Sequence, residues 1–285
     1  MQVKDPNFKL SIILATYNWP KALDLILIQL VGQLSKLPNA EIIVADDGST
    51  SDTSNIIQKH QANCKVIHHV WHEDIGFTKS IILNKAVSIA KGDYLIFIDG
   101  DCIPFPDYLA NHLKLIQEKS FVAGNRVLLS KEFTHTILNK PIILEKIFKW
   151  GPQNWFINKL LGRVNKFMPW LRLNNGEWRF NRCYDWKYPK GCNFGVFKQD
   201  FLAVNGFDEQ FCGWGHEDAD LFIRLLHYGL KIKNGRFSIP VLHLWHKEFT
   251  RNLEPKNWQR LMNRLADKKF IRAIDGIDKV NQEIL

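Results

Sequence analysis

Short apolar runs that end in polar residues alternate with segments of helical length over the first 120 residues of this 285-residue chain. The runs are rich in Ile, Val and Leu and contain few charges, which is typical of strands buried on both faces of a parallel sheet. The predicted strands cover residues 9–18, 40–50, 64–70 and 93–99, and the predicted helices cover 21–37, 51–60 and 76–92. This order predicts an α/β fold in which helices cover both faces of a parallel sheet.

Two of the predicted strands run directly into acidic residues. Asp46 and Asp47 follow the second strand, and Asp99 and Asp101 stand one residue apart after the fourth. Ligands of parallel sheets bind beyond the carboxyl ends of the strands. A pair of carboxylates there suits Mg²⁺ or Mn²⁺, which keep coordination positions open for water and phosphates. Ordinary polar strand ends, or an Asp-Gly-Ser turn that caps a helix, are the alternatives.

Composition narrows the class of partner without choosing one. The hydrophobic content of 46% allows a sizeable core, and the net charge of +9 suits an anionic partner: nucleic acid, acidic lipid or a phosphorylated substrate. None of the five cysteines forms a C-x-x-C pair, so neither a zinc ribbon nor a disulfide framework is predicted. Charges interrupt the opening segment, and no apolar run reaches the roughly 18 residues of a membrane span. We therefore expect a cytoplasmic protein.

A tryptophan flanked by glycines precedes two acids in the stretch "GWGHEDAD", residues 213–220. The flat apolar face of Trp214 suits stacking on the C–H groups of a sugar ring. Glu217 and Asp218 then open a predicted helix, where a carboxylate can orient a hydroxyl and take its proton. An acidic helix cap beside a core tryptophan is the alternative.

Two histidines bracket an apolar pair in the stretch "VLHLWH". The imidazole of His243 or His246 could complete the coordination of a metal ion that a carboxylate already holds. Structural histidines without a metal are the alternative.

The middle of the chain, residues 121–187, is rich in Lys, Arg, Asn and Trp. It predicts loops with one or two amphipathic helices. Aromatic rings and cations together suit the surface of an anionic membrane, and a solvated insertion with some core tryptophans is the alternative. Regular structure is predicted to return over 188–250, and 251–285 predicts a basic, partly helical tail.

Four motifs, "SIILATYN", "IIVADDGSTSDT", "GDYLIFIDGDC" and "NGFDEQFCGWGHEDAD", resemble glycosyltransferase family 2 and occur in the family's order. The C-terminal half resembles the galactosyltransferase-type C-terminal module of bacterial chondroitin-type polymerases and β-1,4-galactosyltransferases. The resemblance covers residues 9–125 and 188–250. It implies a GT-A fold: a Rossmann-like, mostly parallel sheet flanked by helices. The sequence departs from the commoner pattern at Leu83, where an arginine is frequent, and Lys79 would supply the missing charge.

The resemblance also implies roles for individual residues. Asp218 falls at the position of the catalytic base. Asp101 and His246 fall at those of the metal ligands, with His243 as a further candidate. The expected nucleotide-sugar-binding residues are Thr16, Tyr17, Asn18, Asp46, Asp47, Phe77, Lys79, Asp99 and Gly100, and the expected acceptor- or sugar-binding residues are Trp214, Gly215 and Glu217.

The implied reaction is an inverting, metal-dependent transfer from a UDP-sugar to a hydroxyl of a saccharide or glycolipid. A hexose or N-acetylhexosamine would be moved, with Gal or GalNAc favoured, in surface polysaccharide or lipopolysaccharide synthesis. Mn²⁺ or Mg²⁺ is the expected cofactor, the inner face of an anionic cytoplasmic membrane is an expected peripheral contact, and no nucleic acid is expected as partner. The expected division is a nucleotide-sugar-binding half (1–120), an acceptor- or membrane-proximal insertion (121–187), an acceptor and catalytic half (188–250) and a tail (251–285).

Three other classes of protein share part of this pattern. A nucleotidyltransferase could use a similar nucleotide-binding half, although it has no need of the "GWGHED" loop. A glycosidase uses two carboxylates but does not require a D-x-D metal site. A non-catalytic protein that binds an anionic ligand would account for the net charge but not for acids at two strand ends.

Overall fold

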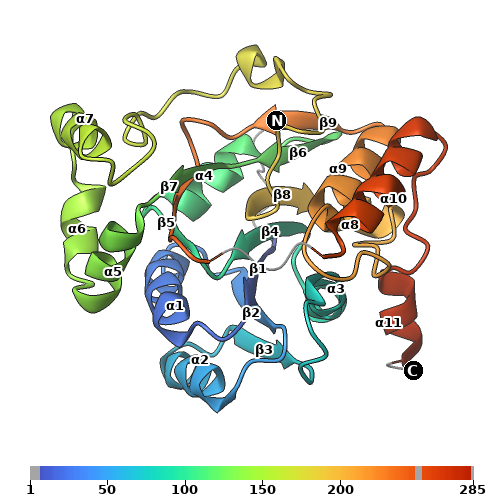
Figure 1. The fold of residues 1–285 in the computed structure, drawn as a ribbon, viewed down its shortest axis with the longest axis horizontal. Helices are drawn as coiled ribbons and strands as arrows, with labels where there is room; N and C mark the ends of the chain where they lie inside the picture. The colour runs from blue at the N-terminus through green and yellow to red at the C-terminus, as the bar shows by residue number, and fades with distance from the viewer. Residues whose placement is uncertain (1–6, 248–251, 284–285) are drawn as a thin grey trace.

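A seven-stranded sheet forms the centre of the computed structural model, which describes residues 7–247 and 252–283 (Figure 1). Three short segments lie outside the described residues: 1–6 at the start of the predicted nucleotide-binding half, 248–251 where the predicted tail begins, and 284–285 at the end of that tail. The strand order is β3-β2-β1-β4-β8-β6-β9, and only β8 runs antiparallel to its neighbours. The strands are β1 (Leu10–Thr16), β2 (Ala40–Asp46), β3 (Ile67–Trp71), β4 (Tyr94–Asp99), β6 (Ser120–Ala123), β8 (Asn193–Phe197) and β9 (Lys231–Asn234). The mostly parallel α/β fold is confirmed.

Helices cover both faces of this sheet because successive residues of its central strands point to opposite sides. Ile12 and Leu14 belong to one buried core with α1, whereas Ile13 and Ala15 belong to a second core with α3. The first core also includes residues of α2 and α4, and the second includes residues of α8, α9 and α11. These helices are α1 (Pro20–Leu34), α2 (Ser51–Asn63), α3 (Lys79–Ile89), α4 (Tyr108–Leu115), α8 (Lys198–Ala203), α9 (Glu217–His227) and α11 (Ile277–Glu283).

A second sheet of three strands lies beyond the end of β4. Its order is β5-β10-β7, with β5 (Cys102–Pro104), β10 (Pro240–His243) and β7 (Asn125–Leu128). β10 runs antiparallel to β5 and parallel to β7. The sequence patterns did not predict β5, β6 or β7, because each has only three or four residues, too few for a periodicity to show.

The insertion at 121–187 was predicted to contain one or two helices, and it contains three: α5 (Lys131–Asn139), α6 (Ile143–Phe148) and α7 (Pro152–Leu160). They lie together at one side of the molecule, away from the seven-stranded sheet (Figure 1). A longer irregular stretch then leads back to β8 and includes a short 3₁₀ helix, Glu177–Phe180. The last long helix, α10 (Glu254–Ala266), packs on α9. Within the described ranges, no helix has both the length and the apolar character needed to cross a bilayer.

One buried amide side chain, that of Asn193, joins the two sheets. Its Nδ2 donates to the carbonyl oxygens of Asn125 (3.2 Å) and Ile239 (2.9 Å). Its Oδ1 accepts a hydrogen bond from the Tyr108 hydroxyl at 2.8 Å. A Cβ atom at Gly124 would lie 2.2 Å from the Asn193 carboxamide carbon, so only glycine fits beside it. Asn193 therefore fixes the position of the small sheet against the large one.

We expect Asn193→Leu to destabilise the protein. The substitution removes the hydrogen bonds to two backbone carbonyls and from the buried Tyr108 hydroxyl, which should lower the free energy of unfolding by at least about 2 kcal/mol. Unfolding in urea measures this change. Asn139→Ala, at the exposed end of α5, is the matched control and should change stability by less than about 0.5 kcal/mol. Equal stabilities of the two variants would contradict the proposed joint between the sheets.

Candidate functional site

The carboxyl ends of β1, β2 and β4 bring the predicted strand-end residues together. The register pairs Thr16 with Asp46 and Ala15 with Asp99. Gly100 follows directly, and a Cβ atom there would lie 2.6 Å from the Ala15 carbonyl oxygen. A glycine is thus required for the turn that carries the chain from Asp99 to Asp101.

Asp46 and Asp47 each hold a loop at this edge. Asp47 accepts hydrogen bonds from the backbone N–H (3.0 Å) and the hydroxyl (2.7 Å) of Thr78. The His72 Nε2 lies 2.8 Å from the same carboxylate. Asp46 is fully buried between the Ser49 N–H (2.9 Å) and the imidazole of His69 (3.0 Å). Asp47 is the more accessible of the two to a nucleotide, and a base contact by either residue stays a prediction.

The predicted nucleotide-contacting residues of the first strand end lie beside these loops. The Tyr17 hydroxyl donates to Asp74 at 3.0 Å, and 40% of Tyr17 is exposed, so its ring is open to a ligand. The Asn18 side chain accepts from the Thr50 N–H at 2.9 Å and so helps to begin α2. The hydroxyl oxygen of Thr16 is buried and has no hydrogen-bond partner among the described residues.

Asp101, His243 and His246 form the candidate metal centre. One potential ligand atom from each residue lies within 4.8 Å of the other two, and the structure describes no other such group of His, Cys, Asp or Glu within residues 7–247 and 252–283. The Asp101 Oδ2 is 3.0 Å from the His246 Nε2 and 3.4 Å from the His243 Nε2. Pairing of β10 with β5 produces this proximity, and the Leu244 N–H donates to the Asp101 carbonyl at 2.8 Å.

The Asp101 carboxylate is ionised, as a ligand of a cation must be, whereas His246 carries a proton at neutral pH that a bound metal ion would displace. Burial opposes ionisation of Asp101, but the hydrogen bond from His246 and the charge of His243 outweigh it and lower the carboxyl pKa to about 2. The hydrogen bond with Asp101 raises the His246 pKa to about 9, whereas burial lowers the pKa of His243. The Lys247 carbonyl lies 3.0 Å from the His246 Nδ1, so that nitrogen can carry the proton while Nε2 faces Asp101.

Glu217 and Asp218 open α9, and the charge of Asp99 acts on both of them. The Asp218 Oδ1 is buried and has no hydrogen-bond partner among the described residues. A Cβ atom at Gly191 would lie 1.7 Å from its Oδ2, so the carboxylate packs directly on the Gly191 backbone. Burial raises the pKa of Asp218, and burial together with the Asp218 charge raises the pKa of Glu217 to about 7. Glu217 can therefore exchange a proton near neutral pH, and the pKa of Asp218 lies above its ordinary value.

Lys79 is the cation among these acids. Its Nζ lies 2.8 Å from the Asp99 Oδ1 and 3.1 Å from Oδ2. Burial alone would lower the Lys79 pKa, but the carboxylates of Asp218, Asp99 and Glu217 outweigh it and raise that pKa. Lys79 thus connects the acids of the strand ends with those of α9.

The Trp214 loop is held from two directions. The Gly213 N–H donates to the Phe77 carbonyl at 3.2 Å, and Gly213 has a φ of +72° that an L side chain rarely adopts. The Asn257 side chain donates to the Gly215 carbonyl at 3.1 Å. Trp214 itself is half-buried. The predicted donor residue Phe77 and the predicted acceptor residues Trp214 and Gly215 are therefore neighbours.

Sequence reasoning missed several residues of this site. Arg126 lies on β7 with its guanidinium 3.9 Å from the Cys192 Sγ, and its charge favours the ionised form of Asp218. Gly191 supports that carboxylate, and Thr78 organises Asp47. A glycine shortly before an apolar run, as in the stretch "KGCN", was the one sequence signal for Gly191. A single arginine within a short strand carries no such signal.

Curated relatives are similar in sequence to most of this chain, and the chain spans about half or less of their length. The chain is 30% identical to hyaluronan synthase of Pasteurella multocida over 254 residues. This match covers 84% of this chain and 24% of that protein. A match of 88 residues is 35% identical to beta-1,4-galactosyltransferase 1 of Mus musculus and covers 31% of this chain and 22% of that protein. Chondroitin synthase of Escherichia coli is 29% identical over 236 residues, which are 77% of this chain and 32% of that protein. The expected likeness to chondroitin-type polymerases and β-1,4-galactosyltransferases is confirmed.

A solved structure and two family models complete the comparison. The mannosyltransferase PcManGT of Pyrobaculum calidifontis, in complex with GDP-Man and Mn²⁺, matches with a TM-score of 0.57 at 16% identity, over 92% of this chain and 65% of that one. This likeness concerns the fold alone, and it agrees with the expected GT-A fold. The model described as the N-terminal domain of galactosyltransferase matches residues 172–247, and that of glycosyl transferase family 2 matches residues 11–187. The chain therefore belongs to glycosyl transferase family 2.

Proposed function

We propose that this protein is an inverting, metal-dependent glycosyltransferase that moves a hexose or N-acetylhexosamine from a UDP-sugar to a hydroxyl of a saccharide or glycolipid. Gal and GalNAc are the favoured sugars, because the match to the galactosyltransferase domain model includes Trp214, Glu217 and Asp218. The observation that carries the proposal is the buried, unpartnered Oδ1 of Asp218, whose carboxylate interacts with the Asp99–Lys79 pair, while the Asp101 cluster begins two residues after Asp99.

The donor is proposed to bind across the ends of β1, β2 and β4. Tyr17 and the Asp47 loop face the nucleotide, and Lys79 faces its diphosphate. Asp101, His246 and His243 fit Mn²⁺ or Mg²⁺, since one carboxylate oxygen and two imidazole nitrogens lie close enough to share one ion. When bound, the ion would stabilise negative charge on the leaving diphosphate.

Asp218 is proposed to act as the general base. Its Oδ1 can accept the hydrogen of the acceptor hydroxyl and take the proton as the oxygen attacks the anomeric carbon. Attack from the face opposite UDP inverts the anomeric configuration. Glu217 is proposed to bind a sugar hydroxyl, and Trp214 to stack on a sugar ring between donor and acceptor.

The insertion of the predicted domain division, residues 121–187, is proposed to lie next to the acceptor and a membrane. Phe156, Leu160 and Leu161 are exposed on and just after α7. Lys149 and Lys159 are exposed near them. Apolar side chains flanked by lysines are typical of segments that rest on an anionic bilayer, which favours a lipid-linked acceptor in surface polysaccharide or lipopolysaccharide synthesis.

Asp218→Asn tests the base. Because an amide cannot take the proton, we expect the transfer rate to fall by about 10²–10⁴, while affinity for UDP with Mn²⁺ stays that of the wild type. A UDP-release assay across UDP-sugars, with calorimetry for UDP binding, measures both. Asp267→Asn, at an exposed position, is the control and should retain activity. Full activity of Asp218→Asn would refute the role, and diphosphate release from a nucleoside triphosphate would favour a nucleotidyltransferase instead.

The pH profile tests the raised pKa values. The base must be ionised, and burial raises the Asp218 pKa. As the pH is lowered, we therefore expect kcat/KM to begin to decrease at a pH above about 4, the ordinary pKa of a carboxyl group. Lys79 lowers the pKa of both acids of α9. Lys79→Met should therefore move this acid limb to higher pH. An acid limb near pH 4, or one that moves down in the variant, would contradict the proposed electrostatics.

Asp101→Ala tests the metal centre. We expect the variant to lose the gain in UDP affinity that Mn²⁺ provides, because the carboxylate shared by both imidazoles is gone. Calorimetry of UDP binding with Mn²⁺ and with a chelator measures the gain, and His246→Ala should reduce it as well. The control is His135→Ala, which removes an exposed imidazole of α5. Metal-dependent UDP binding of wild-type strength in Asp101→Ala would exclude Asp101 as a ligand.

A further inference from the structure

Three cations lead away from Asp218 on the side of the site opposite the nucleotide loops. Arg126 lies on β7, Lys166 follows α7 and Arg236 follows β9. The positive charge of Arg126 acts on Asp218 and also on His243. The row of cations formed by Arg126, Lys166 and Arg236 therefore begins next to the proposed base. In the large sheet, β9 and β6 occupy one edge, whereas β1, β2 and β3, which carry the nucleotide loops, occupy the other (Figure 1).

Backbone contacts hold the segment of Lys166 against β7. The Leu128 N–H donates to the Asn165 side chain at 2.9 Å, and the Asn165 N–H donates to the Leu128 carbonyl at 3.1 Å. The Lys166 ammonium then donates to the side chain of Asn125. These bonds place a lysine of the irregular stretch beside the strand that carries Arg126.

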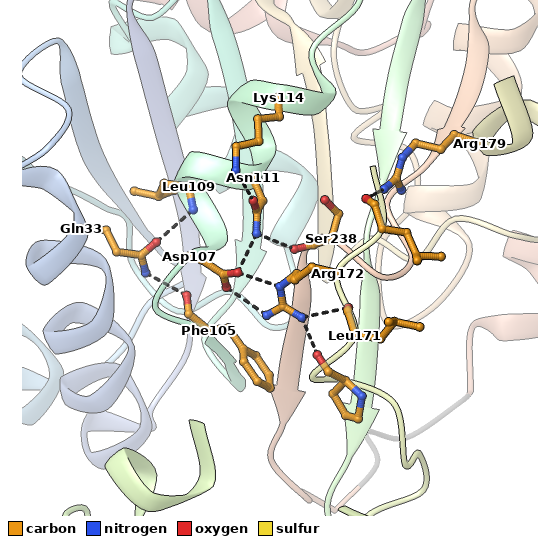
Figure 2. Close-up of polar contacts among 12 residues, drawn as sticks. Gln33, Phe105, Asp107, Leu109, Asn111, Lys114, Leu171, Arg172, Arg179 and Ser238 are labelled. Atoms are coloured by element: carbon orange, nitrogen blue, oxygen red, sulfur yellow. Dashed lines mark hydrogen bonds and ion pairs between the residues drawn. The ribbon is translucent and has the colours of Figure 1, made fainter. Parts of the chain in front are cut away.

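A second set of contacts fixes the segment that follows (Figure 2). Arg172 forms a two-pronged ion pair with Asp107, at 2.7 Å from Nε and 3.0 Å from Nη2. The same guanidinium donates to the Pro169 carbonyl at 2.5 Å. The Leu173 N–H donates to the Phe237 carbonyl at 2.9 Å, which brings this stretch beside Arg236. The cations therefore lie on a braced surface rather than on a free loop.

These segments line a half-open cavity of about 170 Å³. Lys166 and Arg236 line it together with Asn125, Asn165 and Phe237. Burial, and then the charges of Arg236 and Arg126, lower the Lys166 pKa to about 8. Within the part of the chain that the structure describes, no carboxylate forms an ion pair with any of the three cations. A solvated charged face would spread its cations apart, whereas here the partly buried Arg126 and Lys166 and the exposed Arg236 lie close enough for the charges of both arginines to act on Lys166.

We propose that this cavity binds a phosphate group of the acceptor, so that the acceptor is a phosphorylated sugar or a glycan linked through phosphate. The inference rests on the proposed transferase function and names the substrate class of the same site. A guanidinium binds phosphate through paired N–H donors, a lysine adds a point charge, and two asparagine amides can add further donors. Bound phosphate supplies the missing negative charge and leaves the sugar hydroxyl directed along the row to Asp218.

Inorganic phosphate is the first probe, titrated calorimetrically in a buffer with chelator and without UDP. We expect Lys166→Ala/Arg236→Ala to bind phosphate at least about tenfold more weakly than the wild type, because two charge-assisted contacts are lost. Lys65→Ala/Lys91→Ala, which removes two exposed lysines elsewhere, should bind like the wild type. If the double variant does not fold, Arg236→Gln at an exposed position provides the comparison.

The binding of UDP with Mn²⁺ separates this inference from the proposed function, since it should be the same in all these variants. If the wild type does not bind UDP, the proposed donor site is refuted, and the phosphate titration then tests the cavity independently of that site. Equal phosphate affinity in the wild type and the double variant, or none in the wild type, would overturn the inference.

Two further probes identify the source of the phosphate. Hexose 1-phosphate represents a water-soluble acceptor, and phosphatidylcholine vesicles that contain a long-chain isoprenyl phosphate represent a lipid-linked one. Tighter binding of hexose 1-phosphate than of inorganic phosphate assigns the soluble class. Sedimentation with the isoprenyl phosphate vesicles, but not with phosphatidylcholine alone, assigns the lipid class if the double variant loses it. Failure of the wild type to bind either probe would contradict a phosphate-bearing acceptor.

Discussion

The pairing of β10 with β5 is the contact on which the candidate site depends most. β5 follows directly from Asp101, and the antiparallel register places His243 opposite Cys102. The hydrogen bond from the Leu244 N–H to the Asp101 carbonyl extends this pairing by one residue. His246 is thereby delivered to the same carboxylate. Asn193 secures the arrangement from the other side, because it binds the backbone just before β10 and at the start of β7.

Charge compensation is the second theme of the site. Four carboxylates, those of Asp99, Asp101, Glu217 and Asp218, lie at one end of the sheet, and such a concentration of buried negative charge would be unfavourable alone. Lys79 faces three of them, and the two imidazoles face the fourth. Burial, and at Glu217 the charge of Asp218 as well, still raises the pKa values of both acids of α9 despite the opposing charge of Lys79.

Local patterns were sufficient where an element is long and its residues interact with near neighbours. The alternation of apolar strands and helices up to β4 predicted those elements, because a strand buried on both faces must be apolar throughout. The acids at the ends of β2 and β4 followed from the same reasoning. The short strands β5, β6 and β7 were not predictable, since their pairing depends on partners far along the chain. Arg126 lies on one of these strands and was therefore not predicted, although its charge acts on Asp218.

The sequence alone determined the α/β class, the parallel strands and the residue types that could carry the chemistry, because strand burial and acid–metal preferences are local properties. It also carried the family resemblance. Only the tertiary structure decided that Asp101 meets two histidines, that Gly191 supports Asp218, and that Lys166 and Arg236 line one cavity with Asn125. These groups are distant in the chain, and their proximity arises from long-range strand pairing and from the Arg172–Asp107 contact. Composition and spacing along the chain contain no record of such distances.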